Sequence, residues 1–249
     1  MSTIISALKL LHRPSAFLSR LGQRHLLNWM PDKLFLKIAY KGRTGRKLDL
    51  KNPQRYTEKL QWLKLYDRNP LYTQLVDKYE VRDYLKDKID DKHLVKLYGV
   101  YDSFDEIDWG ELPDSFIMKC THGCGCNHIV KNKTDVDQQV LRKQFNKWMK
   151  KNPYPGTREW PYKNVKPRII IEQLLDNDGE PVVDYKFYCF NGKVYCWRSQ
   201  FFLDGKRYHI YFDLDFNNLN IYDSHYPPPK EIAIEFPQYF QKMIDLANI

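Results

Sequence analysis

The stretch from Ser115 to Lys131, SFIMKCTHGCGCNHIVK, constrains the fold more than any other part of the chain. Two apolar runs, Ser115 to Cys120 and Asn127 to Val130, are typical of strands, and the loop between them is too short to be a linker. This pattern predicts a β-hairpin with Gly123 and Gly125 at its tip. Glycine tolerates the positive φ that turns successive backbone N–H groups toward an anion.

Lys119 stands at the mouth of this hairpin, where its charge would suit a phosphate. The alternative is an ordinary hairpin with a surface lysine, because a lone glycine pair is a weak motif. The hairpin also crowds three cysteines and two histidines into one short loop: Cys120, His122, Cys124, Cys126 and His128. Structural zinc sites usually join two separated ligand pairs, so we expect free thiols here rather than a metal site.

Composition narrows the classes of ligand and compartment. A chain of 249 residues forms one large domain or two small ones. Its formal net charge of +9 favours an anionic ligand such as a nucleotide, an acidic glycan or an anionic lipid. Without an Arg-rich block or a nucleic-acid motif, nucleic acid is not an expected partner. The five cysteines, an odd number, and the lack of a recognisable secretory signal favour the cytoplasm.

Residues 1–31 contain no acidic residue and space their apolar side chains at roughly helical intervals. We expect a pair of helices that pack onto the body of the protein. The alternatives are a basic amphipathic segment on the inner face of a membrane and a transit peptide. No apolar run reaches the ~20 residues that a membrane-spanning helix needs.

The middle of the chain predicts two long helices. Residues 41–51 form a basic, glycine-bearing segment that we expect to be a solvated loop. Asn52-Pro53 and Asn69-Pro70 each combine a helix N-cap with proline at the first helical position. The first helix would turn Tyr56, Leu60, Leu63 and Trp62 toward a core. The second would continue to Ile89 and carry Lys78 in its middle, where a solvated lysine is the alternative to a ligand-binding one.

The remaining pattern predicts a strand over residues 93–100 and a helix that starts with a capping box at Thr134 and Asp137 and runs to Lys151. From residue 167 onward the pattern becomes antiparallel β. The expected strands are Arg168–Leu175, Val182–Phe190, Lys193–Leu203 and Arg207–Asp213. Turns are expected at Asn177–Gly179, Asn191-Gly192 and Asp204-Gly205, and a final helix over Glu231–Ile249.

Five of these blocks, in this order, resemble the TupA-like ATP-grasp family of teichuronopeptide biosynthesis. They are TEKLQWLKLYDRNP (57–70), LVDKYEVRDYL (75–85), FIMKCTHGCGCN (116–127), RIIIEQLL (168–175) and DYKFYCFNGK (184–193). The resemblance implies an α+β ATP-grasp fold, with two subdomains clamping ATP. It implies an N-terminal helical, basic extension at 1–51, a subdomain of helices and the glycine loop at 52–165, and an antiparallel β subdomain at 166–249.

The resemblance also implies roles for particular residues. Lys78 and Lys119 look like the two lysines that approach the phosphates, with the loop from His122 to Asn127 covering them. The segment Glu172–Leu175 resembles the strand that meets adenine. Asp184 resembles the carboxylate facing the ribose, and Lys186 would approach the phosphates. The implied nucleotide-binding residues are Lys78, Lys119, His122, Gly123, Gly125, Asn127, Glu172, Gln173, Leu175, Asp184 and Lys186.

The implied chemistry is ATP-dependent joining of a carboxylate to an amine through an acylphosphate, with Mg²⁺, in capsule or cell-surface polysaccharide biosynthesis. The partners would be a nucleotide and an acidic glycan or amino acid. No side chain is assigned as catalytic, because positioning and charge neutralisation carry such reactions. The alternatives are a glycosyltransferase, for which Asp213-Leu214-Asp215 has the D-x-D spacing, and a non-catalytic nucleotide-binding remnant.

This chain departs from the family pattern at two places. Cys124 and Cys126 replace small residues in the loop, and a Cβ there would cost about 1 kcal/mol if its residue needed positive φ. The sequence ends at Ile249, ahead of the strands that carry the family's Mg²⁺-binding carboxylates. We therefore expect the metal-binding end to be missing or divergent, and no metal ligand is assigned.

Overall fold

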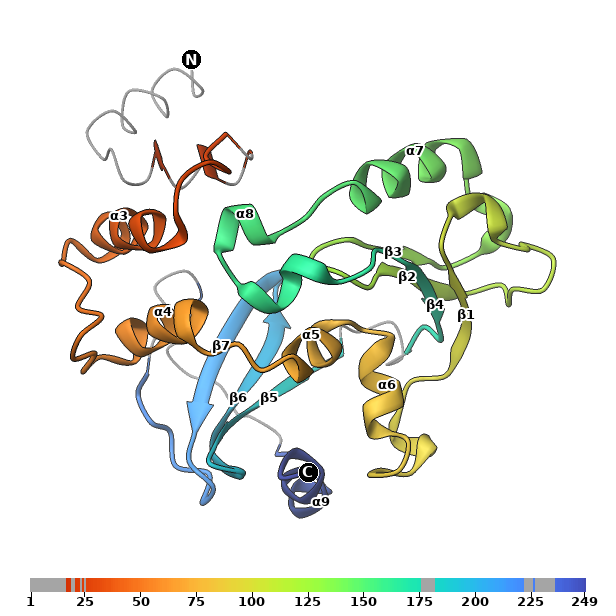
Figure 1. Ribbon diagram of the computed structural model, residues 1–249. Coiled ribbons are helices and arrows are strands. Elements are labelled where there is room, and N and C mark those ends of the chain that lie inside the picture. The colour runs from red at the N-terminus through yellow and green to blue at the C-terminus, as the bar shows by residue number, and fades with distance from the viewer. Residues whose placement is uncertain are drawn as a thin grey trace. The chain divides into compact units, whose positions relative to one another are not determined.

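A computed structural model describes residues 17–18, 21–22, 24, 26–175, 182–221, 226 and 236–249. The chain divides into two compact units, residues 1–173 and 174–249 (Figure 1). The sequence had placed the second subdomain from residue 166. The strand that follows, β4 (Ile169–Glu172), pairs with strands of the first unit. The predicted functional division into an extension and two subdomains stays a prediction.

In the first unit, the chain is helical in a stretch where the sequence predicted a loop. Helix α3 (Asp32–Thr44) extends into the stretch predicted as a solvated loop and ends at Gly45, whose φ is +72°. Leu48, in the same stretch, is buried. Leu48 and the buried side chains of α3 form a small apolar cluster with the turn before the helix. Its members are Leu27, Met30, Phe35, Leu36, Tyr40 and Leu48. This cluster fixes α3 to the chain on both sides of it.

Helix α4 (Tyr56–Tyr66) starts three residues later than Asn52-Pro53 predicted. Its start is set by Glu58, whose buried carboxylate accepts the backbone N–H groups of Gln54 and Arg55. The predicted core face of this helix is wrong as well. Exposed side chains there are Tyr56, Trp62 and Leu63, and Leu60 is half-buried.

The predicted second long helix is two short ones, α5 (Leu71–Val76) and α6 (Glu80–Leu85). Asn69 does start α5, because its side-chain oxygen accepts the N–H of Leu71 at 3.0 Å. Asp77 then breaks the helix, since its Oδ1 accepts the N–H groups of Tyr79 and Glu80. Lys78 therefore lies in a turn and not in the middle of a helix.

A four-stranded antiparallel sheet forms the centre of the first unit, in the order β1-β4-β2-β3. Its strands are β1 (Leu97–Tyr101), β2 (Phe116–Cys120), β3 (Asn127–Val130) and β4 (Ile169–Glu172). The β2–β3 hairpin is confirmed, with Lys119 opposite Asn127 in the last pair. The first strand starts four residues later than predicted, after the turn η1 (Asp91–His93).

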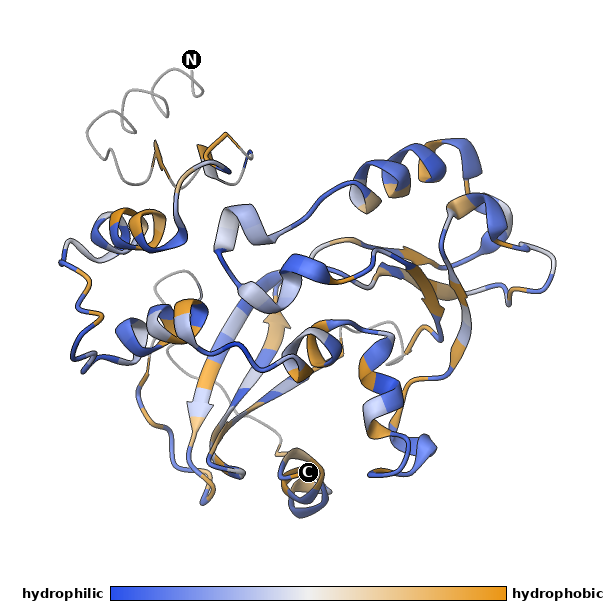
Figure 2. Ribbon diagram, in the orientation of Figure 1, coloured by the Kyte–Doolittle hydropathy of each residue, from blue (hydrophilic) through white to orange (hydrophobic). Residues whose placement is uncertain are grey.

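One face of this sheet packs against α7 (Gln138–Met149), as Figure 1 shows, and Figure 2 marks the apolar strands. Its core includes Phe116, Met118, Ile169, Ile171 and Phe145, and the turn η2 (Phe104–Glu106) adds Phe104. The helix starts at Asp137, which caps Gln139 and Val140, and Thr134 lies in the preceding turn η3 (Lys133–Asp135). The predicted capping box is therefore wrong, although Asp137 does cap the helix.

The proline- and aromatic-rich segment after α7 forms two short turns, α8 (Tyr154–Thr157) and η4 (Trp160–Asn164). Arg158 between them is 2% exposed. Its guanidinium donates to the carbonyl oxygens of Leu27 and Met30 and lies 4.6 Å from the ring centroid of Phe35. The segment is thereby held against the N-terminal cluster.

The second unit contains an antiparallel sheet in the order β5-β6-β7 and the helix α9 (Phe240–Ala247). The strands are β5 (Asp184–Phe190), β6 (Lys193–Leu203) and β7 (Lys206–Phe212). Trp197, fully buried, packs against Ile210, Phe212 and Phe240. The tight turns at Asn191-Gly192 and Asp204-Gly205 are confirmed, since all four residues have positive φ.

Several predicted features lie outside the described residues: most of the N-terminal segment, the turn at 177–179 and the first part of the final helix. Of the predicted helix over residues 231–249, residues 236–239 are not helical and α9 begins at Phe240. Within the described residues, no helix is long and apolar enough to cross a membrane.

Candidate functional site

Lys78 is held by backbone oxygens of the hairpin loop. Its Nζ donates to the carbonyl of Cys120 at 3.1 Å and also to the carbonyl of Gly123, while its own backbone N–H donates to Thr121 O at 3.3 Å. Burial lowers the pKa of this ammonium, and the nearby charge of Lys119 lowers it further. Among the described residues, no carboxylate lies within ion-pair distance of Lys78. A partly buried cation without a counter-charge favours an anionic ligand.

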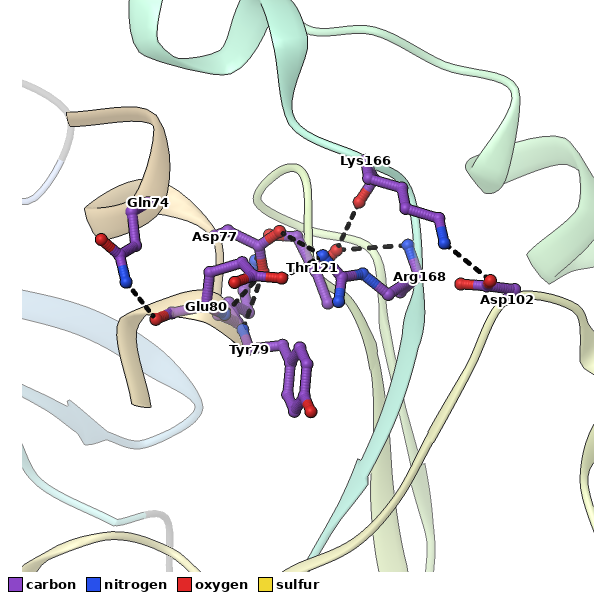
Figure 3. Close-up of polar contacts among 9 residues, drawn as sticks. Gln74, Asp77, Tyr79, Glu80, Asp102, Thr121, Lys166 and Arg168 are labelled. Atoms are coloured by element: carbon purple, nitrogen blue, oxygen red, sulfur yellow. Dashed lines mark hydrogen bonds and ion pairs between the residues drawn. The ribbon is translucent and has the colours of Figure 1, made fainter. Parts of the chain in front are cut away.

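The turn that carries Lys78 is fastened to the hairpin by a cluster around Arg168 (Figure 3). The Arg168 guanidinium reaches Glu80 at 2.5 Å and Asp77 at 3.7 Å, and it lies 4.9 Å from the ring centroid of Tyr79. The backbone of Arg168 pairs with Thr121 on both sides: its N–H donates to Oγ1, and its carbonyl accepts the N–H of Thr121.

Thr121 completes the connection, because its hydroxyl also donates to the carbonyl of Lys166 (Figure 3). The residue is fully buried. One side chain thus joins the end of β2 to the start of β4, and Arg168 joins β4 to the Lys78 turn. This cluster fixes Lys78 relative to the loop.

A second charged cluster lies on the sheet face opposite the α7 core. Glu172 is buried and accepts from Lys119 Nζ at 2.7 Å and from Arg82 Nη1 at 3.1 Å. Arg82 also donates to the carbonyl of Val95 at 2.6 Å. The structure thus brings together the predicted residues Lys119 and Glu172, and it adds Arg82. Because Glu172 has two cationic partners, it keeps one if Lys119 turns to a ligand.

The loop itself offers unpaired donors. Within the described part of the chain, no backbone N–H of residues 122–125 donates a hydrogen bond. Gly125 has a φ of +73°, and Gly123 does not need positive φ. The expected strain at Cys124 and Cys126 is absent, because neither residue has positive φ. This set of free N–H groups beside Lys78 fits the phosphates of a nucleotide.

His122 anchors the loop to the end of α7. Its ring is buried, and Nε2 lies 3.2 Å from the carbonyl oxygen of Trp148 at the end of α7, so this nitrogen is the donor. Burial lowers the pKa of the imidazole. Asn127, by contrast, is exposed and lies opposite Lys119.

The cysteines of the hairpin are free thiols in the structure. Burial raises the pKa of Cys120 to about 12 and also raises that of Cys126. No group of three or more His, Cys, Asp or Glu side chains is placed to hold a metal ion in the part of the chain that the structure describes.

After Glu172, the backbone N–H of Gln173 donates to the carbonyl oxygen of Lys96, the residue before β1, at 2.9 Å. The side chains of Gln173 and Leu175 are exposed. Leu175 belongs to the second unit.

In the second unit, Asp184 and Lys186 stand two positions apart on β5, so they share one face of the sheet, and they form an ion pair at 2.5 Å. Arg198 stands opposite Lys186 on β6, and its guanidinium lies 5.9 Å from the ring centroid of Tyr211. Two cations therefore adjoin on this face. The core residues Trp197 and Phe187 occupy the other face.

The D-x-D pair has a local role. Both carboxylate oxygens of Asp213 are occupied: Oδ1 by the N–H groups of Asp215 and Asn217, and Oδ2 by the Asn217 amide. The Asn217 bond is the largest cause of the lowered pKa of Asp213. The pair thus closes a turn after β7.

Sequence reasoning missed Arg82, Thr121 and Arg168. The only available signal was their place inside the blocks that resemble the TupA-like family. Arg82 stands four residues after Lys78, Thr121 two after Lys119 and Arg168 four before Glu172. Their partners lie far away along the chain, so no local pattern identifies them.

Comparison with known proteins gives one match. A family model described as TupA-like ATPgrasp covers residues 58–249, more than half of the chain. No curated protein and no solved structure matches significantly. The matched range includes every predicted nucleotide-binding residue and leaves α3 outside.

Proposed function

The chain belongs to the TupA-like ATP-grasp family, with its α+β fold, and from this premise we propose that it is an ATP-dependent carboxylate–amine ligase. The observation that carries the proposal is the hairpin loop beside Lys78. The Lys78 ammonium bonds to loop carbonyls and has no carboxylate partner among the described residues, and within the same residues the backbone N–H groups of residues 122–125 donate no hydrogen bond.

The residues of the first unit have distinct tasks in this proposal. Lys78 binds phosphate oxygens in place of the loop carbonyls, and the backbone N–H groups of the loop donate to the same anion. Lys119 leaves Glu172 to join them. Arg82 then keeps Glu172 neutralised, so that the buried carboxylate does not oppose the phosphates.

As substrate, MgATP would transfer its γ-phosphoryl group to a carboxylate oxygen, giving an acylphosphate and ADP. An amine would then attack the acyl carbon, displace phosphate and lose a proton, so that an amide forms. The chain's own contribution is positioning and charge neutralisation, which need no nucleophilic side chain.

From the family resemblance we assign the remaining parts of the nucleotide. The Glu172–Leu175 segment would meet the adenine, Asp184 would face the ribose, and Lys186 would approach the phosphates. The acid or amine would be an acidic glycan or an amino acid used in cell-surface polymer synthesis. The net charge of +9 supports an anionic substrate of this kind. We place the reaction in the cytoplasm, with contact between the basic N-terminal segment and the inner face of the membrane as the alternative.

Calorimetric titration of the full chain with MgATP tests the proposal. Lys78→Met and Lys119→Met should each weaken binding roughly tenfold or more, because each removes a charge-assisted contact of about 1.5–3 kcal/mol. Lys86→Met is the matched control, since Lys86 is exposed and pairs only with Asp83. Equal affinities in all four proteins would contradict the assigned roles.

Parallel titrations separate the other classes of function. Saturable binding of sugar nucleotides without binding of MgATP would favour a glycosyltransferase. MgATP binding without ADP release for any acid and amine pair would favour a non-catalytic nucleotide-binding protein.

A further inference from the structure

A cavity of about 800 Å³ lies within the first unit, lined by α3, α4, α5 and the segment 156–162. Its volume is in the range of small-molecule sites. Aromatic and aliphatic side chains supply much of the wall: Phe35, Leu36, Tyr40, Leu60, Val76 and Tyr162. Walls of this kind suit a ligand with a ring or another compact apolar body.

The cavity belongs only partly to the family-matched region. Its α3 wall and Thr57 of α4 precede residue 58, where the family match begins, whereas the other α4 residues of the wall, α5 and Tyr162 lie inside the match. A site that the whole family shares, such as one for the nucleotide, does not need a wall from outside the match. The cavity therefore fits a ligand that is particular to this chain.

Four charged side chains line the cavity: Arg43, Lys64, Asp67 and Glu159. Asp67 accepts the hydroxyl of Tyr72 at 2.9 Å, and Glu159 pairs with Lys64 at 3.3 Å. Arg43 also lines the cavity, and no carboxylate of the described residues lies within ion-pair distance of its guanidinium. An exposed arginine at the cavity attracts an anion.

One wall adjoins the turn that carries Lys78. Val76 is followed directly by Asp77 and Lys78. Tyr162 lies in η4, which packs against α5. The cavity is thus built in part from the segment that leads into the Lys78 turn.

We propose that this cavity binds the acid substrate of the ligase, a carboxylic acid carried on a ring. The proposal rests on the proposed function for the identity of the reaction and on the cavity for the class of substrate. The ring packs against the aromatic and aliphatic walls, and Arg43 attracts the negative charge.

The test is titration of the nucleotide-free full chain with three ring-bearing acids: 4-hydroxyphenylacetate, cyclohexanecarboxylate and D-glucuronate. Each is compared with its primary amide, which keeps the shape and lacks the charge. At least one acid should bind saturably, and its amide should bind at least tenfold more weakly. Failure of all three acids to bind would overturn the proposal.

Variants locate the binding. Arg43→Gln should weaken it at least fivefold, and Ala39→Phe, which fills the cavity, should abolish it. Lys41→Gln is the matched control, because Lys41 is exposed on the same helix and does not line the cavity. Binding that is unchanged in Arg43→Gln, a surface substitution that leaves the fold intact, would overturn the proposal.

This experiment fails independently of the one for the proposed function. Loss of MgATP binding with intact acid binding would refute the ligase while keeping the cavity as a site. MgATP binding with no acid binding would refute the cavity and keep the ligase.

Discussion

Arg168→Met should destabilise the protein far more than Lys166→Met, although the two residues stand two positions apart in the same segment. The Arg168 side chain is 14% exposed and contacts Glu80, Asp77 and Tyr79. Lys166 is 61% exposed, and its partner Asp102 is exposed too. Methionine keeps much of the apolar stem of either residue and removes its charge.

The expected magnitude follows from these contacts. Losing the charge-assisted bond to Glu80 costs about 1.5–3 kcal/mol, and losing the stacking on Tyr79 about 0.5–1 kcal/mol. The sum is about 3 kcal/mol. Asp77 adds little, since its Oδ1 retains two backbone N–H donors. The exposed Lys166 pair is worth about 0–1 kcal/mol.

Urea denaturation followed by far-ultraviolet circular dichroism measures both changes, with thermal melting as a second probe. About 3 kcal/mol should lower the melting temperature by roughly 6–12 °C in a unit of this size. If the two substitutions changed the unfolding free energy equally, or if Arg168→Met changed it by less than about 1 kcal/mol, the cluster would not fasten the Lys78 turn.

Three further outcomes are expected. Gly125→Ala should cost about 1 kcal/mol of stability, because φ is +73°, whereas Gly123→Ala should cost little; equal melting temperatures would contradict this. Burial lowers the pKa of His122 below 6.5, so the unfolded chain binds the proton more readily and stability is lost as pH falls below 6.5. His122→Gln should flatten that part of the curve of melting temperature against pH. The pKa of Cys120 is raised from 9.0 to about 12. The contribution of its buried, neutral thiol to folding stability is therefore complete below pH 9 and is lost toward pH 12. Cys120→Ala should remove this alkaline loss, and an unchanged slope would refute the assignment.

Local sequence chemistry predicted the hairpins well. Asn191-Gly192 and Asp204-Gly205 need positive φ at both positions, and few other residue pairs accept it. The β2–β3 hairpin followed from apolar runs that flank a glycine-bearing loop. In each case, the residues that determine the structure are neighbours in the chain.

The helices were predicted less well, because side chains competed for backbone donors. The buried carboxylate of Glu58 delays the start of α4, and the carboxylate of Asp77 interrupts what periodicity predicted as one helix. A carboxylate can serve as helix residue or as cap, and the pattern alone does not decide between them. The turn that carries Lys78 depends on that choice.

The long-range ion pairs that hold the candidate site in place could not be predicted from the sequence. Arg168 meets Glu80 across 88 positions, and Arg82 meets Glu172 across 90. Each of these residues, taken alone, is typical of a solvated surface. Only the sheet order β1-β4-β2-β3 brings them together.

The bonds between Lys78 and the hairpin have a consequence for how the molecule opens. Lys78 donates to Thr121 through its backbone and to Gly123 through its ammonium, so the turn cannot separate from the loop without breaking both. In amide hydrogen exchange, the two segments should therefore open as one cooperative unit. A phosphate bound to both the Lys78 ammonium and the loop N–H groups would replace the Gly123 bond and keep the two segments joined, so it would slow exchange in α5 and α6 as well.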